Sequence, residues 1–309
     1  MSGVTDVAMR RIAMRFGAGL AATEMVASDA FLAGAREALL RAEGEGVTPH
    51  VVQIVGHNPE AMKRAARLAQ EWGAEIIDIN MGCPAKRVAG ALAGSALMRD
   101  LDHALRLIEA VAGAVSAPVT VKMRLGWDET NRNAAELARR AERAGAAMLT
   151  VHGRTRQQFY DGRADWAAIR AVVEAVAIPV VANGDCAGIS DAAAMLAASG
   201  ASAVMIGRAA IGAPWLVGQI SKNLAIGVSP SEIPAVQRHA AALEHFESLL
   251  ESLGVEAGLR HARKHLSAYA QKAGAPEHVR LALVTSQDAK NARALLARAF
   301  ADAERREAA

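Results

Sequence analysis

Short apolar runs alternate with longer alanine-rich segments of helical periodicity over the first two-thirds of the chain. One helix is predicted between the Asn58-Pro59 pair, which suits an N-cap and a first turn, and Gly73, which suits a C-terminal turn. Because strands and helices alternate, we expect parallel strands with right-handed crossovers. The apolar runs predict strands at residues 20–27, 50–56, 75–82, 118–126, 146–154, 178–185 and 202–209.

The number of predicted strands is one fewer than a (β/α)8 barrel requires. The opening "MSGVTD" has the pattern of a strand end and the loop after it, and "VAMRRIAMRFG" continues it as a helix. We therefore predict an α/β fold, a (β/α)8 TIM barrel whose first strand is truncated at the N-terminus, with the body of that strand upstream of Met1. "GAGLAA" matches a dinucleotide-binding pattern, but it precedes a strand instead of following one, so its glycines are interpreted as turn residues.

The pattern changes after about Gly227. The segment "VSPSEIP" is a Ser- and Pro-rich connection, and beyond it only helical periodicity remains, as in residues 243–253. We therefore predict two domains, a barrel at 1–228 and a small all-helical domain at 231–309.

Composition narrows the class of protein. Apolar residues make up 52% of the chain, which supports a large core. The two cysteines, Cys83 and Cys186, form no CxxC pair, so we expect neither a metal site nor a disulfide framework, which fits a reducing cytoplasm. We find no signal peptide and no apolar run that could cross a bilayer, so we expect a cytoplasmic protein without membrane association. A net charge of +3 permits a polyanionic partner without requiring one.

Polar residues gather at the ends of the predicted strands. Side chains alternate faces along a strand, and the last inward-facing residues of six strands are polar, whereas intervening residues such as Ile54, Ile79 and Val151 are apolar. In this fold the carboxyl ends of the strands carry the active site. The polar set is Glu24, Gln53, Asp78, Asn80, Lys122, Arg124, His152 and Asn183.

The last two predicted strands end in "NGDCAG" and "IGRAAIG". Glycines allow backbone N–H groups to approach an anion, and the loops after strands seven and eight are the recurrent phosphate site of such barrels. We predict a phosphate-bearing ligand with its phosphate at Gly207 and Arg208. Lys122 and Arg124 would suit an electron-rich ring that gains negative charge when it is reduced. Flavin mononucleotide (FMN) meets both requirements.

Cys83 follows a strand end and lies between Gly82 and Pro84, in a loop predicted at the barrel mouth. An unperturbed thiol has a pKa of about 8.5, so at neutral pH it is mostly protonated and able to give up its proton. This suits a general acid in a hydride-transfer reaction. Cys186, beside the glycine-rich loop, better fits an inert buried thiol.

These residues together resemble the tRNA-dihydrouridine synthases, nearest to their bacterial B-type branch. The resemblance implies an FMN-bearing barrel, a helical domain that helps to hold tRNA, NADPH as reductant, and saturation of the C5–C6 bond of a D-loop uridine. The family pattern has Ala-Pro before the Met-Ser-Gly, and both residues are absent here. The motifs, in family order along nearly the whole chain, are "MSGVTD", "TEMVAS", "QIVGHNPE", "DINMGCPAKRV", "VKMRLGW", "VHGRTR", "ANGD", "MIGRAA" and "RHARKH".

The resemblance also implies roles for individual residues. Cys83 would donate the proton to uridine C5, and the reduced flavin would deliver hydride to C6. Asn80 would lie near flavin or uracil, and Arg124 would face the substrate. The residues implied in FMN binding are Met1, Ser2, Gln53, Lys122, His152, Asn183, Gly184, Asp185, Gly207 and Arg208.

Basic residues gather in the predicted helical domain. Between residues 257 and 300, eight Lys or Arg residues stand against two acidic ones, and three of the eight share one helix face through i, i+3, i+4 spacing. Phosphate contacts require such residues. Phe159 or Tyr160, near the barrel mouth, would be able to stack on a base. The predicted RNA contacts are Arg154, Arg156, Arg260, Arg263 and Lys264.

Two other interpretations stay open. A flavin barrel that reduces a small metabolite, like the dihydroorotate or dihydropyrimidine oxidoreductases, fits the barrel but not the basic helical region. A non-catalytic RNA-binding protein fits the truncated first strand. We expect a monomer in each case.

Overall fold

The computed structural model describes residues 1–227 and 231–308, and its contacts divide the chain into two compact units. The first unit contains Met1–Ser2 and Leu20–Gly207, and the second contains Gly3–Gly19 and the chain from Arg208 onward.

The predicted connection "VSPSEIP" includes residues 228–230, which lie outside the described residues. The domain limits 1–228 and 231–309 stay a prediction, since the two units are defined by contacts and not by continuous ranges of sequence.

The first unit is built on one sheet in which every pairing is parallel. The strand order is β1-β3-β4-β5-β6-β7-β8, and β2 also pairs with β3. The predicted α/β class is confirmed, and β3 to β8 occur where the sequence predicts strands. The strands are β1 (Ala21–Ala22), β2 (Val26–Ala27), β3 (His50–Val55), β4 (Ile76–Met81), β5 (Val119–Arg124), β6 (Ala146–His152), β7 (Val180–Asn183) and β8 (Ala203–Met205).

The prediction of one continuous strand at 20–27 is wrong, because β1 and β2 are separate. Between them, the hydroxyl of Thr23 donates to the carbonyl of Glu24 at 2.7 Å and accepts the N–H of Gln53 at 2.9 Å. A side-chain oxygen thus takes the place of a backbone carbonyl opposite β3, and the ladder is interrupted there.

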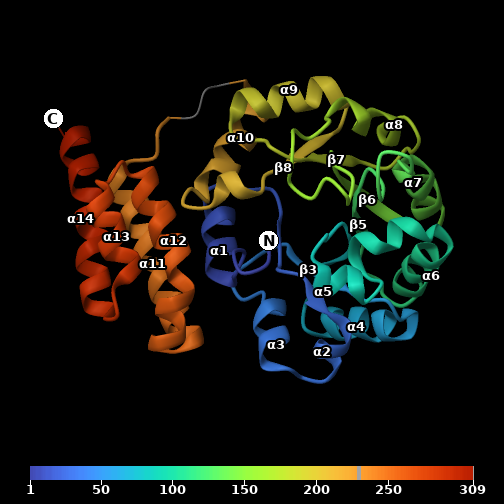
Figure 1. The fold of residues 1–309 in the computed structure, drawn as a ribbon, viewed down its shortest axis with the longest axis horizontal. Helices are drawn as coiled ribbons and strands as arrows, with labels where there is room; N and C mark the ends of the chain where they lie inside the picture. Colours follow the sequence, from blue (N-terminus) through green and yellow to red (C-terminus); the bar gives the residue numbers. More distant parts are fainter. Residues whose placement is uncertain (228–230, 309) are drawn as a thin grey trace. The chain divides into compact units, whose positions relative to one another are not determined.

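Helices surround the sheet of the first unit, with the strands on the inside (Figure 1). Apolar residues such as Ile54, Ile79, Val121 and Val151 are completely buried and alternate with the polar residues of the same strands. The helices of this unit are α2 (Ser28–Leu32), α3 (Arg36–Ala42), α4 (Pro59–Glu71), α5 (Lys86–Gly90), α6 (Leu101–Ala112), α7 (Ala134–Arg143), α8 (Arg170–Val173) and α9 (Ile189–Ser199), with 3-10 helices η1 (Gly94–Arg99) and η2 (Ala167–Ile169).

The ends of α4 follow from its sequence. The side chain of Asn58 accepts the N–H of Ala61 at 3.0 Å, and Pro59 occupies the first turn, where no N–H is needed. Gly73 follows the last turn with a φ of +87°, in the left-handed region that glycine adopts most readily. The predicted helix between these residues is confirmed.

The second unit is helical, and the predicted helical region after residue 231 is confirmed for the described residues. Its apolar core includes Phe246, Leu266, Tyr269 and Phe300. None of the helices in the described part of the chain has the length and apolar character needed to span a bilayer. The helices of this unit are α1 (Val7–Arg15), η3 (Arg208–Ala210), α10 (Trp215–Ile226), α11 (Ala235–Leu253), α12 (Val255–Lys272), α13 (Glu277–Thr285) and α14 (Ala289–Ala308).

Candidate active site

Three polar residues form one row across neighbouring strands. Gln53 on β3, Asp78 on β4 and Thr120 on β5 are direct register partners and are all buried. The Asp78 carboxylate accepts the amide N–H of Gln53 and the hydroxyl of Thr120, each at 2.6 Å. Burial raises the pKa of Asp78 above its ordinary value, and these two hydrogen bonds offset part of the rise. The row therefore contains a buried carboxylic acid whose two oxygens both accept hydrogen bonds.

Asn80 connects this row to the loop that carries the cysteine. Its Nδ2 donates to Gln53 Oε1 at 2.7 Å. Its Oδ1 accepts the backbone N–H groups of Gly82 and Cys83, at 3.1 and 2.9 Å. An amide that donates on one side and accepts on the other has only one orientation that satisfies these partners.

The carbonyl of Cys83 is fixed as well. It accepts the hydroxyl of Ser95 at 2.8 Å and the backbone N–H of the same residue at 3.1 Å. Gly94, with a φ of +59°, allows this approach, because a Cβ there would lie 2.9 Å from the Cys83 oxygen. The thiol itself is free and half-buried. Cys83 therefore has a fixed backbone and a free thiol on a half-buried residue.

Arg124 links the cysteine loop to the segment after β6. Its Nε donates to the carbonyl of Gly82, and its Nη1 donates to the carbonyls of Thr155 and Phe159, all at 2.8 Å. The side chain is almost completely buried, and burial lowers its pKa to about 10, so it remains charged at neutral pH. The guanidinium lies 5.6 Å from the ring centre of Tyr160. The predicted contact of Arg124 with substrate stays a prediction, and in this structure its N–H groups bind backbone carbonyls.

Lys122 follows Thr120 by two residues on β5, and its register partner on β4 is Asn80. Its Nζ donates to Asn183 Oδ1 at 3.2 Å, and Asn183 donates in turn to the carbonyl of Met205 at 2.9 Å. Burial lowers the pKa of Lys122 to about 8, against the raising effect of Asp78. Most of the amine is therefore cationic at neutral pH.

Arg154 is buried and paired with Asp185. Its two terminal nitrogens meet the two carboxylate oxygens at 3.0 and 2.6 Å, and further bonds reach the carbonyls of Asp161 and Gly162. His152 Nε2 lies 3.2 Å from the same guanidinium. Burial, and then the positive charges of nearby Lys and Arg residues, lowers the pKa of His152 to about 2, so the ring is neutral at pH 7. The predicted contact of Arg154 with RNA stays a prediction, which its buried ion pair does not favour.

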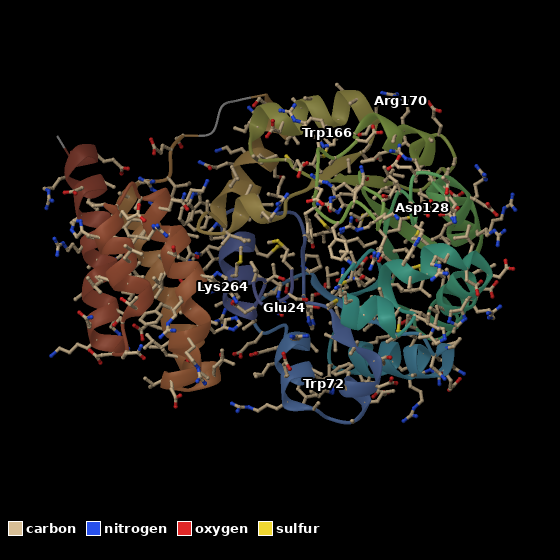
Figure 2. The ribbon with its side chains drawn as sticks, viewed as in Figure 1. Glu24, Trp72, Asp128, Trp166, Arg170 and Lys264 are labelled. Carbon is tan, nitrogen blue, oxygen red and sulfur yellow. The ribbon has the colours of Figure 1, made fainter. Side chains whose placement is uncertain are left out.

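The loop after β7 has a backbone that only glycine fits easily. Gly184 has a φ of +123°, and a Cβ there would lie 2.6 Å from the Ala164 side chain and 2.9 Å from His152. Trp166, labelled in Figure 2, donates its indole N–H to the Gly184 carbonyl at 2.8 Å. Asp185 follows with a φ of +56°. The loop is therefore held in a conformation that is uncommon for side-chain-bearing residues.

The other predicted residues of the first unit lie near its chain ends or in the loop after β6. Met1 is partly exposed, Ser2 is exposed, and a Cβ on Gly207 would have the Met1 sulfur as its nearest neighbour, at 3.7 Å. The guanidinium of Arg156 lies 4.8 Å from the ring of Trp127 and 4.9 Å from that of Phe159.

The rings of both Phe159 and Tyr160 lie near a guanidinium, at 4.9 Å from that of Arg156 and 5.6 Å from that of Arg124 respectively. Tyr160 is 53% exposed, which makes it the better placed of the two for stacking on a base.

The remaining predicted residues belong to the second unit. Arg208 begins η3, and Arg260, Arg263 and Lys264 lie on α12, where Figure 2 labels Lys264. These three side chains line one shallow hollow of about 560 Å³, together with Leu253, Ala257 and His261. Arg260 is exposed and pairs with Glu256 at 3.1 Å. The predicted shared helix face is thus also a basic surface of this unit.

The sequence model of the family described as dihydrouridine synthase (Dus) matches residues 1–304. The chain belongs to the dihydrouridine synthase family.

Curated relatives agree with this membership. A probable tRNA-dihydrouridine synthase of Rhodobacter capsulatus is 50% identical over 307 residues, which is 98% of this chain and 94% of the relative. Another, from Rhizobium leguminosarum bv. phaseoli, is 52% identical over 272 residues, or 88% of this chain and 84% of the relative. The tRNA-dihydrouridine synthase B of Xanthomonas axonopodis pv. citri is 46% identical over 305 residues, or 98% and 91%. The family predicted from the motifs is therefore confirmed.

Among solved structures, the histamine dehydrogenase from Rhizobium sp. 4-9 is similar to this dihydrouridine synthase with a TM-score of 0.53. The match covers 86% of this chain and 47% of that one at 13% identity, so it informs on the fold alone.

The structure brings Gln53, Asn80, Cys83 and Lys122 together at the carboxyl ends of β3 to β5. Two supporting residues of this dihydrouridine synthase site were not predicted. Thr120 has a signal in the sequence, since it lies two residues before Lys122 and therefore on the same face of the strand. Ser95 has no such signal, because it reaches Cys83 from η1, in a region without strand alternation.

A second buried polar cluster of this family member lies in the helical unit. Asp6 caps α1 by accepting the N–H of Met9 at 3.0 Å, and its other oxygen lies 3.0 Å from His245 Nε2 and 3.9 Å from His265 Nε2. His245 also meets the hydroxyl of Tyr269 at 3.0 Å. Burial acts to raise the pKa of Asp6, but the charge and hydrogen bond of His245 outweigh it and hold that pKa well below its ordinary range. Burial lowers the pKa of His265 to about 3.

Proposed function

We propose that this chain reduces the C5–C6 double bond of a D-loop uridine in tRNA and so forms dihydrouridine. Its family and its curated relatives, which are named tRNA-dihydrouridine synthases, support this activity. The observation on which the proposal depends most is the half-buried thiol of Cys83, whose backbone is held by Asn80 and Ser95.

FMN is the cofactor in this proposal, and the residues present fit it. Gln53 Nε2 carries a second N–H besides the one given to Asp78, and Lys122 supplies a cation. A flavin ring accepts hydrogen bonds at its carbonyl oxygens, so donors of this kind suit it. Gly207 has no Cβ, so its backbone N–H can be approached closely by a phosphate. We assign flavin binding to Met1, Ser2, Gln53, Lys122, His152, Asn183, Gly184, Asp185, Gly207 and Arg208.

When bound at these residues and reduced by NADPH, FMN would supply the hydride needed at C6 of the uracil ring. Cys83 gives its thiol proton to C5, which leaves a single bond between the two carbons and a thiolate on the protein. Lys122 and Arg124 bring positive charge near Cys83, and the thiolate regains a proton from water. We assign Asn80 a position near flavin or uracil, and its side chain keeps the Cys83 backbone in place.

The RNA must expose its target base, because a stacked uridine cannot reach a thiol in a protein site. We assign phosphate contacts to the basic surface of α12, formed by Arg260, Arg263 and Lys264, which lines one open hollow. Tyr160, with its exposed ring, is assigned to stacking on a base.

The test uses purified protein loaded with FMN, NADPH, and tRNA from a strain that lacks dihydrouridine. Mass spectrometry of digested tRNA should show dihydrouridine with the unchanged chain and none with Cys83→Ala, although that variant still binds FMN. Cys186→Ala is the matched control, since its thiol is buried and its pKa is raised to about 11 by burial. It should keep full activity.

Full activity of Cys83→Ala would remove the acid role. Absence of dihydrouridine with the unchanged chain would reject the proposal. Oxidation of NADPH with a free pyrimidine in place of tRNA would then favour a small-metabolite reductase, and a protein unable to take up FMN would favour a non-catalytic RNA-binding protein.

A further inference from the structure

A continuous series of side-chain hydrogen bonds leads from the buried row of the sheet to the cysteine loop. Thr120 and Gln53 donate to Asp78, Asn80 donates to Gln53, and the N–H of Cys83 donates to Asn80. Every link is between 2.6 and 2.9 Å. The series crosses three strands before it reaches the backbone of Cys83.

Asp78 sets which group donates and which accepts at each link of this series. A carboxylate oxygen only accepts, so it selects the NH2 side of the Gln53 amide and turns the amide oxygen toward Asn80. Asn80 must then present its NH2 to Gln53 and its oxygen to the N–H groups of Gly82 and Cys83. If both amides turned over, the NH2 group of Asn80 would face two backbone N–H donors, and neither would have an acceptor.

We propose that Asp78 is a positioning residue of the reaction, which acts through the amides of Gln53 and Asn80 to hold the backbone of Cys83 where its thiol can deliver a proton. This inference rests on the proposed function, because it presumes that Cys83 is the proton donor. Asp78 does not touch Cys83 in this arrangement; its effect depends on the acceptor that it presents to Gln53.

The burial of Asp78 is consistent with such a role. An acid in the interior of a sheet is expensive to bury, and an apolar side chain that filled the same space would be buried at lower cost. Gln53 and Thr120, which satisfy the carboxylate, are themselves buried. Packing alone therefore does not explain why an acid is buried here. Its hydrogen bonds point to another role, which is to orient the amides of Gln53 and Asn80.

Three variants separate orientation from packing. Asp78→Leu removes the acceptor and lets both amides turn. Asp78→Asn retains an oxygen for Gln53 while its NH2 donates to the Thr120 hydroxyl, so the direction of the series is preserved. Thr120→Val removes one hydrogen bond from Asp78 without changing the Gln53 link, and it serves as the matched control. If circular dichroism shows that Asp78→Leu is unfolded, Asp78→Ala takes its place, since a water there can donate or accept.

Two measurements are made on each variant. The first is the rate at which iodoacetamide alkylates Cys83 in the protein without FMN or tRNA, with Cys186 in the same chain as the internal reference. The second is kcat and KM for tRNA in the FMN-loaded enzyme. A displaced reacting group lowers kcat by about 10- to 100-fold. We expect this loss in Asp78→Leu, with KM for tRNA little changed and with an altered Cys83 alkylation rate.

Asp78→Asn and Thr120→Val should each lose clearly less kcat than Asp78→Leu and should change the alkylation rate of Cys83 less. The inference is overturned if Asp78→Leu, or Asp78→Ala in its place, leaves the alkylation rate of Cys83 and kcat unchanged. It is also overturned if Thr120→Val is as damaging as Asp78→Leu, because the effect would then come from packing. Failure of the proposed function has a different signature, since the unchanged chain would form no dihydrouridine, whereas alkylation requires neither RNA nor cofactor.

Discussion

The ion pair between Arg154 and Asp185 gives the sharpest stability prediction. The arginine side chain is 2% exposed, the carboxylate is 26% exposed, and the closest contact between them is 2.6 Å. Replacing Asp185 by alanine leaves a buried guanidinium without its counter-charge. The carbonyls of Asp161 and Gly162 still accept from it, so part of its hydrogen bonding survives.

Removing one partner of a buried pair costs about 3–5 kcal/mol. The surviving carbonyl contacts and the partial exposure of Asp185 place this case at the lower limit, about 3 kcal/mol. A domain of this size loses about 2–4 °C of Tm per kcal/mol, so the midpoint for Asp185→Ala should fall by about 6–12 °C.

The assay is scanning calorimetry of the protein without FMN, because a ligand that binds the folded state raises Tm by itself. Arg163→Ala, at an exposed arginine on the loop after β6 that also carries Arg154, is the control and should change the free energy of unfolding by no more than about 0.5 kcal/mol. Adding Arg154→Leu to Asp185→Ala should recover part of the loss, since the unpaired charge is removed. A midpoint for Asp185→Ala within the range of the control would refute the claim that this pair neutralises a buried charge.

Two further predictions concern other parts of the chain. Asp6→Asn keeps an oxygen for the α1 cap but removes the charge near His245, so it should destabilise the protein by about 2 kcal/mol at pH 7. Because the pKa of Asp6 is lowered in the folded state, its contribution is complete above the unfolded pKa of about 3.9 and is lost as the pH falls from there through the lower folded pKa. The gap between the urea midpoints of the two proteins should therefore stay constant from about pH 7 to about pH 5 and shrink only below about pH 4. A gap that does not change between about pH 5 and about pH 3 would contradict this origin. Gly184→Ala should cost about 1–3 kcal/mol, because its φ of +123° and its contact with Ala164 exclude a side chain. Gly188→Ala is the control, as a Cβ there has nothing within 4 Å, and equal Tm values for the two variants would count against a strained Gly184.

The sequence predicted most of the sheet because its strands are marked by uninterrupted apolar runs with polar ends, as in 75–82 and 118–126. The prediction of one strand at 20–27 was wrong because the hydroxyl of Thr23 takes the place of a backbone acceptor there. Apolar periodicity carries no information about such a side-chain hydrogen bond. The sequence predicted that Cys83 follows the end of a strand, because the apolar run ends near Asn80. In the structure Cys83 follows β4, and its N–H donates to Asn80.

The supporting contacts were not readable. The sequence identifies Arg154 as a basic residue near the mouth, but it cannot tell that Asp185, 31 residues later, neutralises it. Ser95 reaches Cys83 through a turn made possible by Gly94, and that geometry depends on tertiary packing instead of local pattern.

The guanidinium of Arg124 ties two loops to one rigid strand, since it binds Gly82 on one side and Thr155 and Phe159 on the other. An incoming macromolecule that pulls the outer loop away must break two of these bonds or drag the residue before the cysteine along with it. Displacement of the outer loop and displacement of the residue before Cys83 are therefore mechanically joined, so under the proposed function a poorly seated substrate would meet a misaligned thiol.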